Sequence, residues 1–396
     1  MNKKLMAVAV AGALAAPATV LAQVQIYGRA NLGFDNYSAT GATAANQDFK
    51  ARNRVFDNSS RLGFRGTEDL GGGLRAVFVI ESGVNIDTGN QGGQAGATCG
   101  AANCNASTGF LASRDSYVGL EGNWGRVTFG RQSIYWVNGV IAQSGANYIN
   151  VDVATTGAIG RVIAPTARTS NVMAYNSPTV NGFNATVSYA PNSEATGVNL
   201  SANAKIWGVT GRYSGIVNAQ VDYAVNDKTP VTGSTVPTTQ KLTGLKVGVG
   251  YPYAPGAQIA VVFISEKNDN LNAAVAGFAA LGDSVKANAV IVNWEHTFGN
   301  IQALAEVGKV AKAKGCSVSA NCDNTEATGF MVAGRYLFSK RTAAYVSYNK
   351  ITNKDNATWD LSGGGQSSAS ASGGFLPATS AGADPRIIAL GVVHNF

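Results

Sequence analysis

The sequence predicts an all-β protein, a 16-stranded antiparallel transmembrane β-barrel. Three observations lead to this fold class. Apolar and polar residues alternate with period two along most of the chain, short and long connections follow one another in turn, and aromatic residues gather at the ends of the alternating segments. These features are typical of outer-membrane barrels, which have a lipid-facing row on every strand, short periplasmic turns and long external loops.

The first 22 residues predict export from the cytoplasm. Lys3 and Lys4 precede an apolar run that ends on Val20-Leu21-Ala22, which is the pattern of a secretory signal peptide with a small-residue cleavage site. The run is short and contains Pro17, which argues against a membrane-anchor helix. We therefore expect a signal peptide over residues 1–22 and a mature barrel over residues 23–396.

The composition of the mature chain narrows the function classes. Without the two lysines of the leader, 28 basic and 23 acidic residues remain, a net charge of +5. Charged residues make up 13% of the chain and form no run of like sign, so no nucleic-acid partner is expected. The chain after the leader contains no uninterrupted stretch of ~18 apolar residues, so no transmembrane helix is expected.

Sixteen candidate strands follow from the alternation. In the first of them, Val24, Ile26 and Phe34 share one face, whereas Tyr27 and Arg29 share the other. The candidate strands begin near residues 23, 59, 74, 114, 126, 168, 183, 203, 216, 241, 258, 286, 301, 328, 342 and 386.

The connections between the strands alternate in length, as in an up-and-down meander. Short turns are expected at 68–73, 122–125, 177–182, 214–215, 253–256, 299–300 and 339–340. Long loops are expected at about 37–58, 85–113, 133–167, 190–202, 227–240, 267–285, 310–327 and 354–385. An open sheet in lipid exposes unpaired backbone groups, so the strand at Gln23 is expected to pair with the strand that ends at Phe396.

Two strands leave the direction of their side chains open. In RDSYVGLEG (114–122) both parities are partly apolar, so the pattern does not fix the direction of Arg114. QIAVVFISE (258–266) is apolar on both parities between Ile259 and Ile264. Packing of its inner side against a loop is our first interpretation of this strand.

The sequence offers little for catalysis. It contains no GxSxG elbow and no HExxH motif, and its two histidines lie inside strand patterns. We expect no enzyme activity, no metal and no cofactor. The four cysteines form two close pairs, Cys99 with Cys104 and Cys316 with Cys322, which are candidates for short-range disulfides in an exported protein.

Charged residues on the inner wall are the candidate functional residues. A barrel of about sixteen strands encloses an aqueous channel, and rings of charge in such a channel select ions by sign. Parity directs Arg29, Arg61, Arg65 and Arg75 inward, Arg131 and Arg168 flank the third long loop, and that loop contains Asp152 and Arg161. Glu81, inward by the same parity, is expected to neutralise part of the field. The alternative for each arginine is an ordinary solvated wall residue.

Four segments resemble the general diffusion porins of Gram-negative bacteria, particularly their betaproteobacterial branch. They are SSRLGFRGTEDLGGGLRAVFVIESG (59–83), RDSYVGLEGNWGRVTFGRQ (114–132), RTSNVMAYNSPTVNGFNATVSYA (168–190) and LFSKRTAAYVSYNKITN (337–353). The resemblance implies a homotrimer in the outer membrane, in contact with outer-membrane lipid and lipopolysaccharide, with the third loop folded into each pore. It also implies that the barrel-assembly machinery recognises the C-terminal strand and its final Phe396.

The resemblance further implies a passive channel for small hydrophilic solutes and ions that prefers anions. In anion-selective members of that branch, three arginines form a cluster at the constriction. By motif position these correspond to Arg61, Arg114 and Arg168, which implies that Arg114 points inward. The third loop departs from the pattern of many relatives because it lacks their acidic and Pro-Phe-Gly segments. The chain also ends on GVVHNF, where a basic residue is common.

Two other functions remain open from the sequence. One is a substrate-specific channel in which Tyr135, Trp136 and Tyr148 offer a stacking surface to a sugar or an aromatic or organic acid. The other is a plugged barrel that acts through its surface loops. Conductance in planar bilayers separates the plugged barrel from both kinds of channel.

Overall fold

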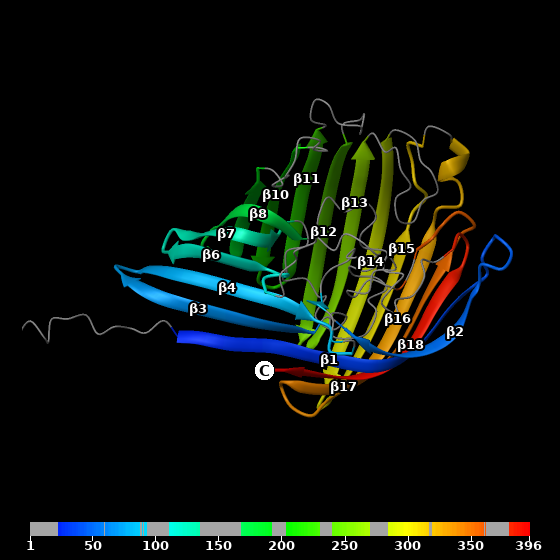
Figure 1. The fold of residues 1–396 in the computed structure, drawn as a ribbon, viewed down its shortest axis with the longest axis horizontal. Coiled ribbons are helices and arrows are strands. Elements are labelled where there is room, and N and C mark those ends of the chain that lie inside the picture. The colour runs from blue at the N-terminus through cyan, green and yellow to red at the C-terminus, as the bar shows by residue number, and fades with distance from the viewer. Residues whose placement is uncertain are drawn as a thin grey trace, which may run out of the picture.

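The computed structural model describes residues 23–58, 60–87, 89, 91–92, 111–134, 168–191, 203–229, 240–269, 284–316, 319–359, 361 and 380–396. These residues form one antiparallel sheet of 18 strands that closes on itself (Figure 1). The strands are β1 (Gln23–Thr40), β2 (Phe49–Asp57), β3 (Arg61–Gly71), β4 (Leu74–Val84), β5 (Gln91–Gly92), β6 (Ser116–Gly122), β7 (Gly125–Ser133), β8 (Arg168–Asn176), β9 (Phe183–Ala190), β10 (Asn203–Ser214), β11 (Asn218–Thr229), β12 (Gln240–Ala254), β13 (Ala257–Asp269), β14 (Ser284–Phe298), β15 (Ile301–Val310), β16 (Ala327–Leu337), β17 (Thr342–Asn353) and β18 (Asp384–Asn395). Among the described residues, no helix is long and apolar enough to cross a membrane.

The sheet closes where the first strand meets the last. The register of β1 and β18 runs from Arg29 opposite Asn395 to Thr40 opposite Asp384. Beyond this register, Phe396 and Gly28 exchange two backbone hydrogen bonds of 3.0 and 3.1 Å. The predicted closure of the barrel between its two terminal strands is confirmed.

The 18 strands form sixteen staves, that is, sixteen successive segments of the barrel wall. β1 pairs with β3 along its first part and with β2 along its second part, so β2 and β3 together form a single stave. β5 is a two-residue strand beside the end of β4, which also pairs with β6. The closed barrel of sixteen staves agrees with the number that the period-two pattern predicts.

The predicted loop at 37–58 is partly wrong, because β1 continues to Thr40 and β2 lies within that range. Arg54 Nε of β2 lies 2.9 Å from Oδ1 of the buried Asp35, and Asn53 accepts a hydrogen bond of 2.7 Å from Asn36. Most side chains of β2, FKARNRVFD, are polar or charged. The alternation of apolar and polar residues therefore does not predict this strand.

Each strand has an outward apolar row and an inward row. On β13, Ile259, Val261 and Phe263 are 44%, 47% and 38% exposed, whereas Val262 and Ile264 are buried. The outward row meets lipid in a membrane barrel. The strand that is apolar on both parities thus has one lipid-facing row and one row that packs inside the barrel.

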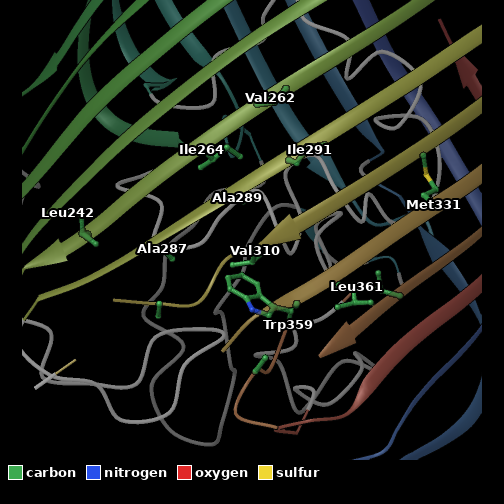
Figure 2. Packing of buried hydrophobic residues seen from close by; sticks show 14 of the residues in the cluster. Leu242, Val262, Ile264, Ala287, Ala289, Ile291, Val310, Met331, Trp359 and Leu361 are labelled. Carbon is green, nitrogen blue, oxygen red and sulfur yellow. The ribbon is translucent and has the colours of Figure 1, made fainter. Parts of the chain in front are cut away.

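Part of the inner wall is covered by an apolar cluster that includes loop residues. The cluster contains Leu242, Val262, Ile264, Ile291, Val310, Met331, Trp359 and Leu361, among others. Figure 2 shows Trp359 beside Val310, with Leu361 nearby. Because Trp359 and Leu361 follow β17, the interpretation that the inner side of β13 packs against a loop fits the cluster.

The segments that follow β1, β15 and β17 are bound to one another. Thr43 donates its N–H to the carbonyl of Ala381 (2.9 Å), and Asn356 donates its N–H to the carbonyl of Asn324 (3.0 Å). A disulfide joins Cys316 to Cys322 in the segment after β15. The other predicted pair, Cys99 and Cys104, lies outside the described residues.

Candidate functional site

Charged side chains from β1, β3 and β4 gather around one glycine of the inner wall. Gly63 lies opposite Tyr27 of β1 and opposite Glu81 of β4, and Arg61 lies opposite Arg29. Residues opposite one another in an antiparallel pair lie on the same face. A Cβ at Gly63 would lie 2.4 Å from Cζ of Tyr27, so the missing side chain makes room for the tyrosine ring.

The carboxylate of Glu81 is the centre of this group. The Tyr27 hydroxyl donates a hydrogen bond of 3.1 Å to Oε2, and Arg114 Nε donates one of 2.5 Å to Oε1. Arg61 Nε lies 3.8 Å from Oε2. The side chains of Glu81 and Arg114 are only 12% and 17% exposed, so this ion pair is largely shielded from water. One carboxylate therefore faces two guanidinium groups and balances the charge of only one of them.

Arg114 reaches Glu81 from a bend rather than from a strand. β6 begins at Ser116, two residues after the predicted start, and Arg114 lies in the bend before it. Its backbone N–H donates to the carbonyl of Glu81 (2.9 Å). Burial lowers the pKa of the Arg114 guanidinium, repulsion from Arg168 and Arg61 acts in the same direction, and Glu81 opposes both. Arg114 thus lies within electrostatic range of the other two arginines named by the family resemblance, Arg61 and Arg168.

Arg168 has its own carboxylate partner, which the sequence reasoning missed. As the first residue of β8, Arg168 places Nε 3.1 Å from Asp115 Oδ1 and Nη2 3.4 Å from Oδ2. Asp115 also accepts hydrogen bonds from the Ser133 N–H (2.9 Å) and hydroxyl (3.1 Å). The signal in the sequence is its position: Asp115 directly follows Arg114 and shares the parity of Tyr117 and Glu121, which lie opposite the inward-facing Val79 and Arg75.

Arg131 lies beside Arg168 at an irregular point of the sheet. The register of β7 and β8 shifts between Gly130 and Gln132, where Gly130 has φ +151°. Arg131 donates from Nε to the Ser113 carbonyl (3.1 Å) and from Nη1 to Ser170 Oγ (3.0 Å). Strand parity does not describe its direction because of this bulge.

The remaining predicted arginines occupy different parts of the wall. Arg29 is buried, and Arg65 donates from Nε to Gln25 Oε1 (2.9 Å) and stacks over the Tyr27 ring at 5.1 Å. Arg75 forms an ion pair with Glu121, next to the short turns. Arg75 is six residues from Glu81 along β4, roughly 20 Å. The structure therefore does not bring Arg75 to the other arginines.

Several predicted residues fall in the third long loop. Tyr135, Trp136, Tyr148, Asp152 and Arg161 lie outside the described residues. Ile134, the last described residue before them, is buried, and its Cγ2 lies 2.6 Å from where a Cβ of Gly208 would be. Gly208 belongs to the inner wall of β10, three strands away from β7. Ile134 thus lies against the inner face of β10.

A second polar group, also missed from the sequence, lies on the inner wall of β10–β12. Lys246 Nζ lies 2.9 Å from Asp222 Oδ2, and both side chains are buried. Thr210 and Gln220 donate hydrogen bonds of 2.6 and 2.7 Å to the same carboxylate. This group is internally compensated, because one ammonium faces one carboxylate.

The arginine cluster, Arg61, Arg114 and Arg168, keeps an excess of positive charge. Its three guanidinium groups contact the carboxylates of Glu81 and Asp115, which leaves a net charge of +1. Arg131 adds a further positive charge beside Arg168 and bonds only neutral oxygens in the described residues. A wall of this kind attracts anions and repels cations, because a ring of charge in a pore selects ions by sign.

Comparison with known proteins agrees with the barrel fold. A family model described as Gram-negative porin matches residues 5–356. Outer membrane porin protein 32 of Delftia acidovorans is 26% identical over 415 residues that cover 100% of both chains. An outer membrane porin protein of Bordetella pertussis is 33% identical over 205 residues, which span about half (48%) of either chain. The structure described as an anion-selective porin from Comamonas acidovorans has the same fold, with a TM-score of 0.68, 21% identity, and coverage of 95% of this chain and 100% of that chain.

Proposed function

Because the chain belongs to the Gram-negative porin family, whose members form outer-membrane channels for passive diffusion, we propose that the arginine cluster makes this channel prefer anions. Small hydrophilic solutes and ions cross it down their concentration gradients, without enzyme activity and without a cofactor. The observation that carries the proposal is the incomplete compensation of Arg61, Arg114 and Arg168 by Glu81 and Asp115.

The strength of the field suits conduction. A unit charge acts on a monovalent ion ~4 Å away with ~1 kcal/mol in a water-like dielectric and with several times more in a drier site. An anion is therefore favoured at the cluster, yet it leaves again because the binding is weak. Conduction requires this balance between entry and release. The negative charges of Glu81 and Asp115 weaken the attraction of the cluster for an anion.

Two further lines support the assignment. A solved structure of the same fold is described as an anion-selective porin, which supports the same preference for this chain by analogy. The outward rows of the strands also offer apolar surface for lipid and for neighbouring copies. We propose a homotrimer in contact with outer-membrane lipid and lipopolysaccharide, assembled by machinery that recognises β18 and Phe396.

Removing the three arginines tests the proposal. Arg61→Ala, Arg114→Ala and Arg168→Ala together are expected to shift the reversal potential in a KCl gradient from the anion side toward the cation side. The carboxylates of Glu81 and Asp115 then remain without their arginines, which reverses the local charge from +1 to −2. The measurement is a planar-bilayer recording of the purified, folded protein.

A matched control removes three arginines elsewhere. Arg75→Ala, Arg126→Ala and Arg341→Ala take away the same charge near the short turns, where Glu121 contacts Arg75 and lies 3.6 Å from Arg126. This control variant is expected to keep most of the anion preference. An unchanged preference in the first variant, or an equal loss in both, means that the cluster does not set selectivity.

The buried apolar cluster favours one alternative function, a plugged barrel that does not conduct. Inward-facing Ile264, Ile291 and Met331 are buried instead of facing open water, so part of the lumen is filled. A fully plugged barrel shows no conductance steps in the same recording. A substrate-specific channel shows conductance that one sugar or organic acid blocks saturably.

A further inference from the structure

The outward face of the barrel carries lysines just beyond its apolar band. On β13, Lys267 continues the outward row of Ile259, Val261 and Phe263, and it is exposed between buried inward residues. On β14, Lys286 is exposed between two buried residues in the same way. β13, β14 and β15 are neighbours in the sheet, so these positions form one surface (Figure 1).

Three of these lysines lie in a row across adjacent segments. Lys267 is directly opposite Lys286 in the register of β13 and β14. Lys286 and Lys314 exchange two backbone hydrogen bonds of 2.8 and 2.9 Å, which places Lys314 on the other side of Lys286. Opposed residues in such a pair have Cα atoms about 5 Å apart, and like charges at this spacing repel. We refer to Lys267, Lys286 and Lys314 as the lysine row.

The row is only partly compensated by carboxylates. Lys267 Nζ lies 2.6 Å from Asp269. Within the described ranges, no carboxylate lies within the 4.0 Å limit of an ion pair from Lys286 or Lys314. Lys312, which is also exposed, is paired with Asp323. The surface therefore keeps at least two ammonium groups available to an anion.

Two other outward lysines of the barrel have an acid beside them. Lys205 is opposite Asp227 in the register of β10 and β11. Lys350 lies 3.8 Å from Asp384. Lys350 is also directly opposite Arg386 in the register of β17 and β18, so opposed cations occur elsewhere, and the lysine row differs in having three lysines in succession.

Next to the row, the outward positions are Ser265 on β13 and Asn288 on β14, and most outward residues beyond them are apolar, with the exposed Lys309 opposite Val290. Val261 and Phe263 on β13, Val290 on β14 and Val307 on β15 are all exposed. The outward row from Lys267 to Ile259 spans eight residues, roughly 26 Å along the strand, which at a tilt of about 40° approaches the height of an outer-membrane apolar band. At the far end of this surface, Trp294 Nε1 of β14 donates to the hydroxyl of Tyr253 on β12 (2.8 Å). Aromatic groups of this kind mark a membrane interface, so the lysine row lies at the opposite, long-loop interface.

We propose that the lysine row binds the phosphate groups of a phosphorylated lipid whose acyl chains lie against the outward rows of β13–β15. Three neighbouring lysines, two of them outside any ion pair among the described residues, offer several N–H donors to phosphate oxygens, and the apolar rows receive the chains. This inference rests on the membrane location proposed above and assigns its lipid contact to a place on the chain. It is independent of the arginine cluster, which is on the inner wall.

The test measures lipid binding by the purified, folded, full-length mature protein. The probe is bisphosphorylated hexa-acyl lipid A in a non-ionic detergent, and native mass spectrometry counts the bound lipids. With Lys267→Gln, Lys286→Gln and Lys314→Gln together, affinity is expected to fall about a hundredfold, because each cation near a charged membrane surface contributes roughly a factor of five. The control, Lys205→Gln with Lys340→Gln and Lys350→Gln, removes equal charge elsewhere and is expected to change affinity less than threefold.

The remaining outcomes overturn the inference. Equal binding by the triple variant and the wild type means that the row does not hold the lipid. Equal binding of lipid A and its fully dephosphorylated form means that acyl packing alone is responsible. Displacement of lipid A by an equal concentration of inorganic phosphate means a site for free phosphate instead of lipid. Single-channel conductance of the triple variant is expected to match the wild type, so a failure of lipid binding is distinguishable from a failure of the channel.

Discussion

Replacing Glu81 with glutamine changes the charge of the arginine cluster and keeps its shape. The glutamate carboxylate accepts hydrogen bonds from Tyr27 and Arg114 and lies 3.8 Å from Arg61 Nε. Glutamine has the same length and retains one carbonyl oxygen for the same donors. The Glu81→Gln variant leaves three guanidinium groups with one carboxylate, Asp115, so the local net charge rises from +1 to +2.

The expected effect follows from the added charge. An anion that passes ~6 Å from the site gains about 0.7 kcal/mol from one more positive charge at the dielectric constant of water. This corresponds to roughly a threefold rise in anion occupancy, because 1.4 kcal/mol is a factor of ten. A cation is disfavoured by a similar factor, so the anion-to-cation permeability ratio is expected to rise about tenfold.

The assay is the reversal potential of single channels in a KCl gradient, recorded at low ionic strength to limit screening. We expect the reversal potential of Glu81→Gln to move toward the limit of a purely anion-conducting pore. Glu121→Gln is the matched control, because Glu121 also lies between two arginines, Arg75 and Arg126, but near the short turns. If Glu81→Gln leaves the reversal potential unchanged, or if Glu121→Gln moves it equally, the field of the arginine cluster does not control permeation.

Two further predictions concern assembly and stability. Deletion of Phe396 removes the two backbone hydrogen bonds to Gly28 that extend barrel closure, so the yield of the proposed trimer is expected to fall while assembled channels keep their conductance. Phe396→Ala retains the backbone hydrogen bonds and isolates the contribution of the ring. Normal trimer yield after the deletion, measured by gel electrophoresis without heating, contradicts this role. Lys246→Ala leaves the buried Asp222 carboxylate without its ammonium and is expected to cost ~3–5 kcal/mol of folding free energy, with much of the loss recovered by adding Asp222→Asn. Denaturant unfolding followed by heat-modifiable gel mobility measures the cost, and wild-type stability of Lys246→Ala would show that the pair is dispensable.

The fold could be predicted from the sequence because lipid outside and an enclosed interior impose period two. Ile259, Val261 and Phe263 are apolar because they face outward, and the alternation makes their strand visible. Closure followed from the cost of an open edge in lipid, and β1 pairs with β18 as expected. The sequence pattern did not predict β2, because polar residues occupy most of its positions.

Loop contacts could not be predicted by the same means. Trp359 donates from Nε1 to the Thr325 carbonyl (3.4 Å) across 34 positions of sequence. No local period records such a contact, since it depends on how two long loops meet. The apolar inner row of β13 gave the only hint that something packs against it.

The site was predictable where strand geometry is regular and unpredictable where it is not. Parity alone directs Arg61 and Glu81 to one face. Gly63, two residues after Arg61, lies opposite Glu81, so the register of β3 and β4 brings the two side chains together. The Arg114–Glu81 and Arg168–Asp115 contacts join residues 33 and 53 positions apart, through a bend before β6 and a bulge between β7 and β8. Arginines can be counted in a sequence, but the field in the pore depends on which carboxylates the bends bring to them. We therefore propose that the anion preference of this channel depends on the positive charge that Glu81 and Asp115 leave uncompensated, and that each of these two carboxylates affects selectivity as much as an arginine does.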